Sequence, residues 1–562
     1  MGDMDVWGSR RFRVRGAMAI AGVATLAIAL CSCGVGGKPS EAESVVQRFT
    51  DLLDTQDYTK AADLTSYPAA ASATMKQMFE GLATGKVDYE TSQVIDLDPQ
   101  SAIFSMDVAW NFGEHKDWTY TIQGTVRKLA IGWRISWDPA VVMPQLADKR
   151  TVKLVRTTAK PPPRVVDLSG DALMTEQTIN VIKIDPSRTG DLVGSTNALA
   201  DAIEPVAPLI TGPSLMQQLA ASQGQPVIAV NLREGDFEIL EPRMARVPGV
   251  VMEKQPKLIS ADRRTWSPML DALREVWKDS QETTAGWGVQ IFEADGRFVS
   301  QVAGYQGPAG PDISATMDQR LQRAAEDAVV SVGTPASVVA IQPSTGAVVA
   351  VAQNSYATEK GPIAFTGLFP AGGTMELFRT VAAAAKNKAP QDVSVQEAAE
   401  AATALGVGVD FKVHGLDEVT GRISAPGRST EQVRQGAGAD AVLASPFGMA
   451  IAAAAISRGS VVPPMIENGK PSTTDTPVPG LTPPAVDRLR GLMHEGIGKP
   501  ETAALRGFRD VTAFAATGGT DGWLLATMGD LVFAVHIADV DSGDATSRLA
   551  AVLLKSLASP EP

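Results

Sequence analysis

The spacing of apolar residues changes between residues 82 and 87, and this change limits what the N-terminal part of the chain can form. Before it, apolar residues recur at helical spacing, which predicts helices at 42–53, 58–64 and 69–82. After it, apolar and polar residues alternate, which predicts strands at 87–95, 102–112, 118–129 and 133–142. Helices followed by a long antiparallel sheet predict an α+β cone.

The end of this region has a distinctive sequence. The segment from Trp133 to Pro139 reads WRISWDP, and Pro144 and Leu146 follow it. It is similar to the closing segment of the NTF2-like domain that precedes the transpeptidase in some penicillin-binding proteins. This resemblance implies an NTF2-like domain at 41–150.

The first 32 residues have the composition of an export signal. Basic residues from Arg10 to Arg15 precede an apolar run from Ala17 to Leu30, and Leu30-Cys31-Ser32-Cys33 resembles a lipobox. So short an apolar run suits a signal peptide better than a membrane span. We expect residues 1–32 to be a lipoprotein signal peptide, Cys33 to be lipidated, and 33–40 to be a tether that holds the protein at the extracytoplasmic face of the cell membrane. An uncleaved N-terminal anchor is the alternative.

Charge and residue usage exclude several classes of function. The formal net charge is −13, so the chain gains nothing from a phosphate backbone and we expect no nucleic acid as a partner. The two cysteines, Cys31 and Cys33, both lie at the predicted cleavage site, which leaves no thiol for catalysis. The four histidines, which lack the spacing of metal ligands, are His115, His414, His494 and His536. We therefore expect no metal and no cofactor.

The middle of the chain has a mixed pattern. A run of prolines at 161–163 predicts a stiff linker. Beyond it we expect helices at 197–203 and 266–279 and strands at 227–230 and 287–293. Position and length resemble the pedestal, or dimerisation, domain of class B penicillin-binding proteins, which implies such a domain at 160–312.

From residue 316 the chain resembles the penicillin-binding transpeptidase domain. Thr316 to Glu326 is similar to the first helix of that domain, and 335–352 predicts a hairpin with a Ser-Thr-Gly turn at 344–346. The family order continues in the segment 443–450, the paired strands at 523–536 and the amphipathic helix at 546–557. The resemblance implies a transpeptidase-like (β-lactamase-like) α+β domain with a central antiparallel sheet at 316–562.

The nucleophile turn of that family, Pro-x-Gly-Ser-x-x-Lys, is altered in this chain. The family reaction uses a Ser at the start of a helix and a Lys one turn later that takes its proton. In Phe369 to Glu376 (FPAGGTME), Gly373 stands at the Ser position and Glu376 at the Lys position. Thr374 is one residue late, so a rotation of about 100° aims its hydroxyl elsewhere. Glu376 then reads as an acidic residue in a first helical turn, with Gly373 as the N-cap.

The other two family motifs are also changed. The best match to Ser-x-Asn is Ser394-Val395-Gln396, with Gln396 in place of Asn, although Ser394 also suits a helix N-cap. The match to Lys-Thr/Ser-Gly begins at Ala516, which replaces the Lys. The residues left to line a vestigial cleft are Thr374, Thr517, Gly518 and Thr520.

These losses predict a pseudoenzyme. The chain reads as a penicillin-binding-protein-like lipoprotein, catalytically inactive, that acts as a scaffold or regulator in peptidoglycan synthesis or cell division. Its expected partners are the membrane, through the lipid anchor, and cell-wall synthesis or division proteins. Two alternatives stay open: a module that binds a peptidoglycan stem peptide or a β-lactam non-covalently, and an active D,D-transpeptidase in peptidoglycan cross-linking whose motifs are misaligned.

Overall fold

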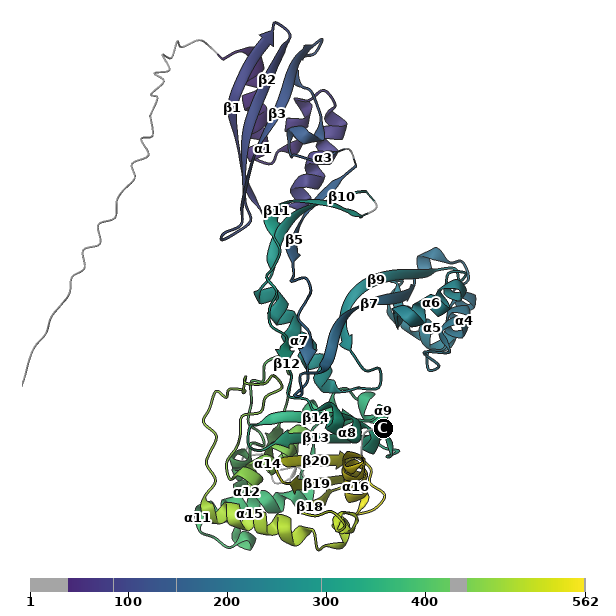
Figure 1. Cartoon of the computed structure of the whole chain (residues 1–562), viewed down its shortest axis with the longest axis vertical. Coiled ribbons are helices and arrows are strands. Elements are labelled where there is room, and N and C mark those ends of the chain that lie inside the picture. The colour runs from purple at the N-terminus through teal and green to yellow at the C-terminus, as the bar shows by residue number, and fades with distance from the viewer. Residues whose placement is uncertain (1–38, 84, 148, 295, 425–441, 560–562) are drawn as a thin grey trace, which may run out of the picture. The chain divides into compact units, whose positions relative to one another are not determined.

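The computed structural model describes residues 39–559, apart from 84, 148, 295 and 425–441 (Figure 1). The predicted signal peptide, Cys33 and most of the tether lie outside the described residues. The chain divides into two compact units: residues up to Lys153 together with Ile291–Ser300, and Leu154–Gln290 together with the residues from Gln301 on. The predicted mixed α+β architecture is confirmed. The predicted boundary between 160–312 and 316–562 falls inside the second unit and stays a prediction.

Three helices and a four-stranded sheet form most of the first unit. They are α1 (Glu41–Asp54), α2 (Tyr58–Asp63), α3 (Pro68–Gly81), β1 (Lys86–Asp98), β2 (Ser101–Asn111), β3 (Asp117–Leu129) and β4 (Gly132–Ile135). The sheet is antiparallel, in the order β1-β2-β3-β4. A capping box between Ser40 and Glu43 starts α1. Alternate residues of β2 are buried, and Phe104 and Trp110 share the core with Phe49 of α1.

The predicted helices and strands of this unit are confirmed in type and order, with one difference at the end. The strand predicted at 133–142 stops at Ile135, because Asp138 caps the 3-10 helix η1 (Pro139–Val141) and a proline cannot donate to a sheet.

A three-stranded sheet follows in the order β11-β10-β5, formed by β5 (Thr151–Thr157), β10 (Gly286–Phe292) and β11 (Phe298–Tyr305).

The second unit contains a five-stranded sheet built around one long strand. Its strands are β6 (Val165–Val166), β7 (Ala172–Ile184), β8 (Val227–Arg233), β9 (Val250–Ser260) and β12 (Ile313–Ser314). Antiparallel pairing with β9 runs along β7 from Met174 to Ile184. The other elements of this region are the 3-10 helix η2 (Pro186–Arg188) and the helices α4 (Leu192–Ile203), α5 (Gly212–Ala221), α6 (Glu234–Met244) and α7 (Pro268–Thr283). The predictions that correspond to α4, α7, β8 and β10 are confirmed, whereas β7 and β9 were not predicted.

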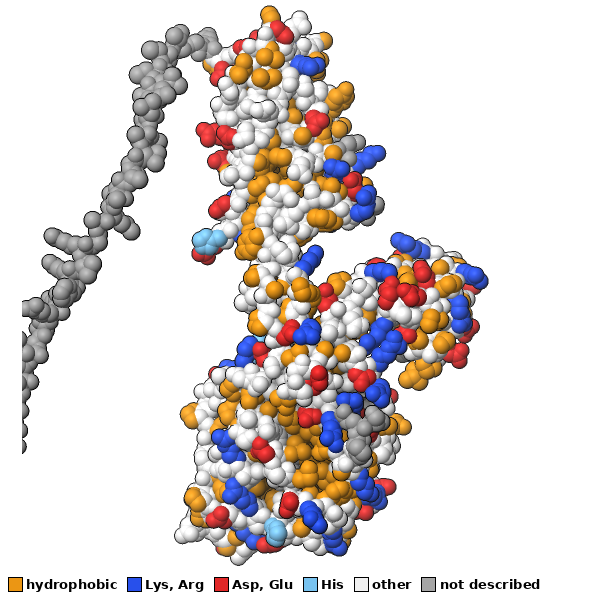
Figure 2. All heavy atoms as spheres, viewed as in Figure 1, with side chains coloured by type: hydrophobic (Ala, Val, Ile, Leu, Met, Phe, Trp, Pro, Cys, Tyr) orange, Lys and Arg blue, Asp and Glu red, His pale blue; other side chains and the backbone are white. Residues whose placement is uncertain are grey.

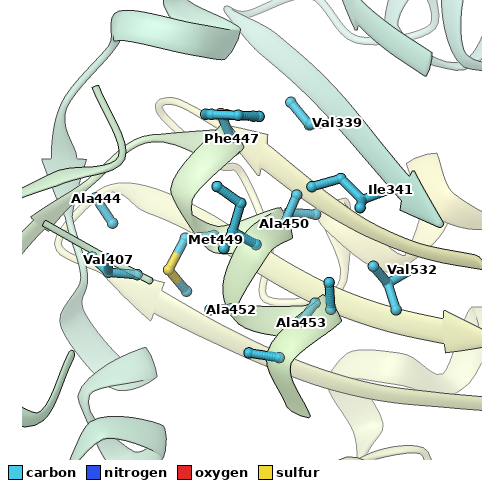
Figure 3. Close-up of a cluster of buried hydrophobic side chains, with 14 of the residues drawn as sticks. Val339, Ile341, Val407, Ala444, Phe447, Met449, Ala450, Ala452, Ala453 and Val532 are labelled. Atoms are coloured by element: carbon cyan, nitrogen blue, oxygen red, sulfur yellow. The ribbon is translucent and has the colours of Figure 1, made fainter. Parts of the chain in front are cut away.

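The same unit contains a second five-stranded sheet, which is antiparallel in the order β14-β13-β20-β19-β18 (Figure 1). Its strands are β13 (Ala336–Gln342), β14 (Ala347–Gln353), β18 (Val511–Gly518), β19 (Asp521–Met528) and β20 (Leu531–Ile537). One face packs against α8 (Gln319–Val330) and α16 (Ala545–Ala558). The opposite face packs against α14 (Pro446–Arg458), which is apolar on all sides and fully buried over most of its length (Figure 3).

The same unit contains further helices and short strands. They are α9 (Ser355–Thr358), α10 (Ile363–Thr366), β15 (Phe369–Pro370), η3 (Gly372–Thr374), α11 (Met375–Lys386), η4 (Pro390–Asp392), α12 (Val395–Ala401), η5 (Ala402–Leu405), β16 (Gly421–Ile423), β17 (Val442–Ala444), α15 (Pro483–Gly496) and η6 (Pro500–Leu505). A small sheet in the order β15-β17-β16 holds the chain just before η3. In the part of the chain that the structure describes, no helix is long and apolar enough to cross a membrane.

Candidate functional site

The altered nucleophile turn folds as a 3-10 turn followed by a helix. Gly372, Gly373 and Thr374 form η3, and α11 begins at Met375 with Thr374 as its N-cap. The expectation that Gly373 is the N-cap is therefore wrong, because the 3-10 turn moves the start of the α-helix by one residue. The Thr374 side chain is fully buried, and its hydroxyl donates to the carbonyl oxygen of Ala371 at 2.7 Å. Glu376 lies exposed in the first turn of α11, where its charge favours the helix dipole.

Gly373 lies directly against the end of β18. A Cβ atom at Gly373 would be 3.0 Å from the Cβ of Ala516 and 3.4 Å from the carbonyl oxygen of Thr517. The structure therefore brings together the two positions that the resemblance pairs with the family's Ser and Lys. Gly373 itself is exposed and Ala516 is half-buried, so neither position is deep inside the core.

The preceding glycine makes a still closer approach to the same strand. Gly372 has a φ of +51°, and a Cβ there would lie 2.2 Å from the Cα of Gly518 and 2.4 Å from the carbonyl oxygen of Thr517. A Cβ at Gly518 would in turn lie 2.4 Å from the carbonyl oxygen of Pro370. Only glycine fits at these two positions, and the backbones of η3 and β18 are in direct contact.

The remaining residues assigned to the vestigial cleft do not converge on Gly373. Thr517 is exposed, and because side chains alternate along a strand it faces away from the side that Ala516 occupies. Thr520 is exposed in the turn between β18 and β19, where its carbonyl oxygen accepts a hydrogen bond from the amide of Val540. Of these residues on and after β18, Gly518 and the backbone of Thr517 contact the nucleophile turn, whereas the Thr517 side chain does not.

The second-motif match lies elsewhere. Ser394 is the N-cap of α12: its hydroxyl accepts from the amide of Glu397 at 3.2 Å, and the Glu397 carboxylate accepts from the amide of Ser394 at 2.9 Å. Lys386 and Lys388 both donate to that carboxylate, at 2.9 and 2.8 Å, and these hydrogen bonds lower the pKa of Glu397. Gln396 donates to Glu400 at 3.0 Å.

This cluster lies at the C-terminal end of α11, whereas Gly373 precedes the N-terminal end. A helix of this length spans about 18 Å. The structure therefore does not bring Ser394 or Gln396 to Gly373, and this placement gives no support to their alignment with Ser-x-Asn. A capping box and two basic residues account for the contacts that Ser394 and Glu397 make.

A row of inward-facing side chains crosses the central sheet beside the nucleophile turn. The strand registers place Ser337 opposite His536, His536 opposite Trp523, and Trp523 opposite Ala516. The indole nitrogen of Trp523 donates to the carbonyl oxygen of Pro370 at 2.9 Å. The ring of Phe369 stacks on His536 with 3.8 Å between the ring centres. These contacts attach β15, and hence η3, to the sheet.

His536 is the centre of this row and is fully buried. Its Nε2 lies 3.0 Å from a carboxylate oxygen of Asp521. Burial lowers the pKa of His536, and Asp521 opposes that shift. Within the described residues, neither Nδ1 of His536 nor the hydroxyl of Ser337 has a hydrogen-bond partner. Sequence reasoning missed this cluster, although strand alternation in 521–537 places Trp523 and His536 on one face of the sheet.

Neither this cluster nor another group in the described ranges has three or more His, Cys, Asp or Glu residues placed to hold a metal ion. The arrangement around Gly373 offers two backbones, a methyl group and aromatic rings. Of the atoms that lie nearest to a Cβ at Gly373 among the described residues, none is a side-chain oxygen.

Comparison with known proteins identifies the N-terminal region. Residues 41–150 match the family model described as the NTF2-like N-terminal transpeptidase domain. The predicted NTF2-like domain is thereby confirmed, and the description of the model associates this domain with transpeptidases. It covers less than half of the chain. No curated protein matches the chain significantly.

Proposed function

We propose that this protein is a penicillin-binding-protein-like lipoprotein that acts as a non-catalytic scaffold or regulator in peptidoglycan synthesis or cell division. One observation carries the proposal. Gly373 stands at the position of the family's Ser, and Ala516 stands at the position of the Lys in Lys-Thr/Ser-Gly. The two residues are neighbours, as the resemblance leads us to expect, yet neither has a functional group in its side chain. The NTF2-like domain at 41–150 supports the relation to transpeptidases.

The chemistry of acyl transfer explains why these changes matter. The reaction needs an oxygen nucleophile, a base that takes its proton and donors that stabilise the oxyanion. The hydroxyl nearest to Gly373 in sequence, that of Thr374, is buried and donates to Ala371. Glu376 is a carboxylate without a hydroxyl to activate. In a nucleophile–base unit, loss of one key member costs on the order of 10⁶ in rate.

The sequence contains no relocated motif. No lysine of the chain has a serine three residues before it, so no Ser-x-x-Lys exists elsewhere. A lipid anchor at Cys33 would place the protein at the outer face of the membrane, where cell-wall synthesis and division proteins would be its partners.

Labelling with a fluorescent penicillin tests the proposal. We expect no covalent adduct on the purified protein, whereas an active penicillin-binding protein in the same reaction is labelled. A stable mass increase equal to that of the antibiotic, mapped to a Ser or Thr within 316–557, would overturn the proposal in favour of an active D,D-transpeptidase. Titration with a wall pentapeptide distinguishes a scaffold, which gives no signal, from a non-covalent binding module.

A further inference from the structure

A basic groove lies between α7 and one face of the sheet that contains β7, β8 and β9. Its volume is about 440 Å³, within the range of ligand-binding pockets. Four apolar side chains contribute to its walls: Ile179, Leu258, Ile259 and Trp277. The polar part of the lining has one carboxylate, Glu275, one amide, Asn231, and four cationic side chains: Arg233, Lys257, Arg274 and Lys278. In Figure 2, Lys and Arg side chains gather near the base of the strands β7 and β9.

The pairing of the strands explains why these residues share one face. Arg233 of β8 lies opposite Ile179 of β7, and Lys257 of β9 lies opposite Gln177. Residues two apart on a strand point the same way, so Arg233, Ile179 and Lys257 all face the groove. Two cations from different strands therefore flank an apolar floor.

The four cationic side chains differ in whether a carboxylate pairs with them. Arg274 pairs with Asp271, and the Lys278 amine lies 3.4 Å from a Glu275 carboxylate oxygen. By contrast, Arg233 donates to the carbonyl oxygen of Ser260 at 2.8 Å. Lys257 donates to the side-chain oxygen of Asn231 at 3.2 Å. Both of these partners are neutral, and among the described residues neither Arg233 nor Lys257 has an ion pair.

Arg233 is half-buried, and among the described residues it forms no ion pair, although the carboxylates of Asp236 and Asp262 lie near enough to act on its charge. Burial lowers its pKa, and the neighbouring Arg263, which is itself paired with Asp236, lowers it further, whereas the charges of Asp236 and Asp262 oppose this shift. The net shift disfavours the charged guanidinium, and the negative charge of a carboxylate bound beside it would oppose that shift. Arginine and lysine bind carboxylates through short charge-assisted hydrogen bonds.

We propose that this groove binds a short peptide that carries carboxylates next to apolar side chains. The carboxylates would pair with Arg233 and Lys257, and the apolar side chains would pack on Ile179 and Trp277. The net charge of −13 disfavours a long polyanion, because every part of it beyond the groove would be repelled. A flat anionic membrane surface cannot enter a concave groove. This proposal does not depend on whether the site around Gly373 is catalytically active.

Calorimetric titration of the full chain in detergent tests this inference. The probe is acetyl-Leu-Glu-Leu-Glu-amide, and the matched neutral peptide has Gln in place of each Glu. We expect the acidic peptide to bind at least about 10-fold more tightly than the neutral one, and more weakly as salt rises. The double variant Arg233→Gln with Lys257→Gln should lose at least about 10-fold in affinity.

Lys254→Gln is the matched control. Lys254 is three residues from Lys257 on the same strand, so it faces the opposite side of the sheet, and it pairs with Glu234 at 2.6 Å. This control should bind like the unchanged protein. If loss of the Arg233 contact to Ser260 prevents folding, Lys257→Gln alone provides the test, because its partner Asn231 is an exposed side chain. Three results would overturn the proposal. The first is equal binding of the acidic and the neutral peptide, and the second is unchanged binding of the acidic peptide by the folded variants. The third is complete competition by inorganic phosphate at a concentration equal to that of the peptide.

Discussion

Gly372 and Gly373 are neighbours in the chain but have different roles in the structure. Gly372 has a positive φ and lets the backbone of η3 touch Gly518. Gly373 has an ordinary φ, and a Cβ there would meet mainly the methyl group of Ala516, at 3.0 Å. The first position therefore requires glycine, whereas a small shift would admit another residue at the second. The loss of the nucleophile at Gly373 is a chemical change more than a steric one.

Gly372→Ala tests the closeness of the two backbones. A Cβ at a positive φ alone costs roughly 1 kcal/mol of unfolding free energy. Overpacking against Gly518 should raise the total to roughly 3 kcal/mol. The control is Gly469→Ala, because Gly469 also has a positive φ (+78°) but open space around it. Urea denaturation of both variants measures the difference, and equal destabilisation would show that the contact with Gly518 is loose.

Introducing the family's Ser at position 373 and its Lys at position 376 tests whether the rest of the catalytic site can still support the reaction. We expect Gly373→Ser with Glu376→Lys to give weak penicillin acylation at most, because Ala516 supplies no cation and no Ser-x-Asn lies nearby. Turnover of a peptide substrate should stay roughly 10³-fold or more below that of an active relative. Intact-mass measurement after penicillin treatment gives the acylation, and Gly373→Ala with Glu376→Lys is the control without a nucleophile. Turnover equal to that of an active relative would mean that Ala516 is not the third-motif position.

At the scale of elements, the attachment of β15 to the central sheet determines the shape of the site. Trp523 and His536 come from adjacent strands, and both contact the segment Phe369–Pro370. The same two strands position Asp521 beside His536. This contact brings η3 to β18, so the arrangement of Gly373 and Ala516 depends on a buried histidine whose pKa is lowered by that burial.

The free energy of unfolding should therefore decrease as pH is lowered, and His536 should contribute to that decrease. Burial lowers the pKa of His536 in the folded state. As pH falls, this histidine therefore takes up a proton in the unfolded chain before it does so in the folded chain, near the ordinary histidine pKa of about 6.5. The contribution of the neutral imidazole is fully present above that value and is lost as pH falls below it. Glu326 and Glu418 act in the opposite sense, since burial raises the pKa of each to about 7.

The measurement is the difference between the unchanged protein and His536→Gln. Urea unfolding between about pH 7.5 and pH 5 should show a steeper loss of stability in the unchanged protein. The two glutamates are present in both proteins and cancel in the difference. Identical pH slopes would show that His536 takes up a proton in the folded state as easily as in the unfolded one.

At the scale of the whole molecule, an NTF2-like domain at 41–150 precedes a unit with a five-stranded antiparallel sheet. The proposed function requires this molecule to be held at the outer face of a membrane. We expect mass analysis of membrane-extracted protein to find cleavage before Cys33 and acylation of that residue, with two or more chains needed for stable anchoring. Cys33→Ser should move the protein out of the membrane fraction. An unmodified Cys33 or a retained Met1 would contradict the anchor.

Local sequence determined much of the N-terminal fold and the chemical loss. The helix–strand order of 41–135 follows from apolar spacing, because the period of the pattern sets which face of an element is buried, and the hairpin of β13 and β14 follows from two apolar runs around a Ser-Thr-Gly turn. The absence of a Ser at Gly373 and of a Lys at Ala516 can also be read from the sequence. Only the tertiary structure decided that these two positions touch, that Ser394 lies at the far end of α11, and that Arg233 and Lys257 share a groove. Such contacts join distant segments, and they depend on how whole elements pack, which local spacing does not encode.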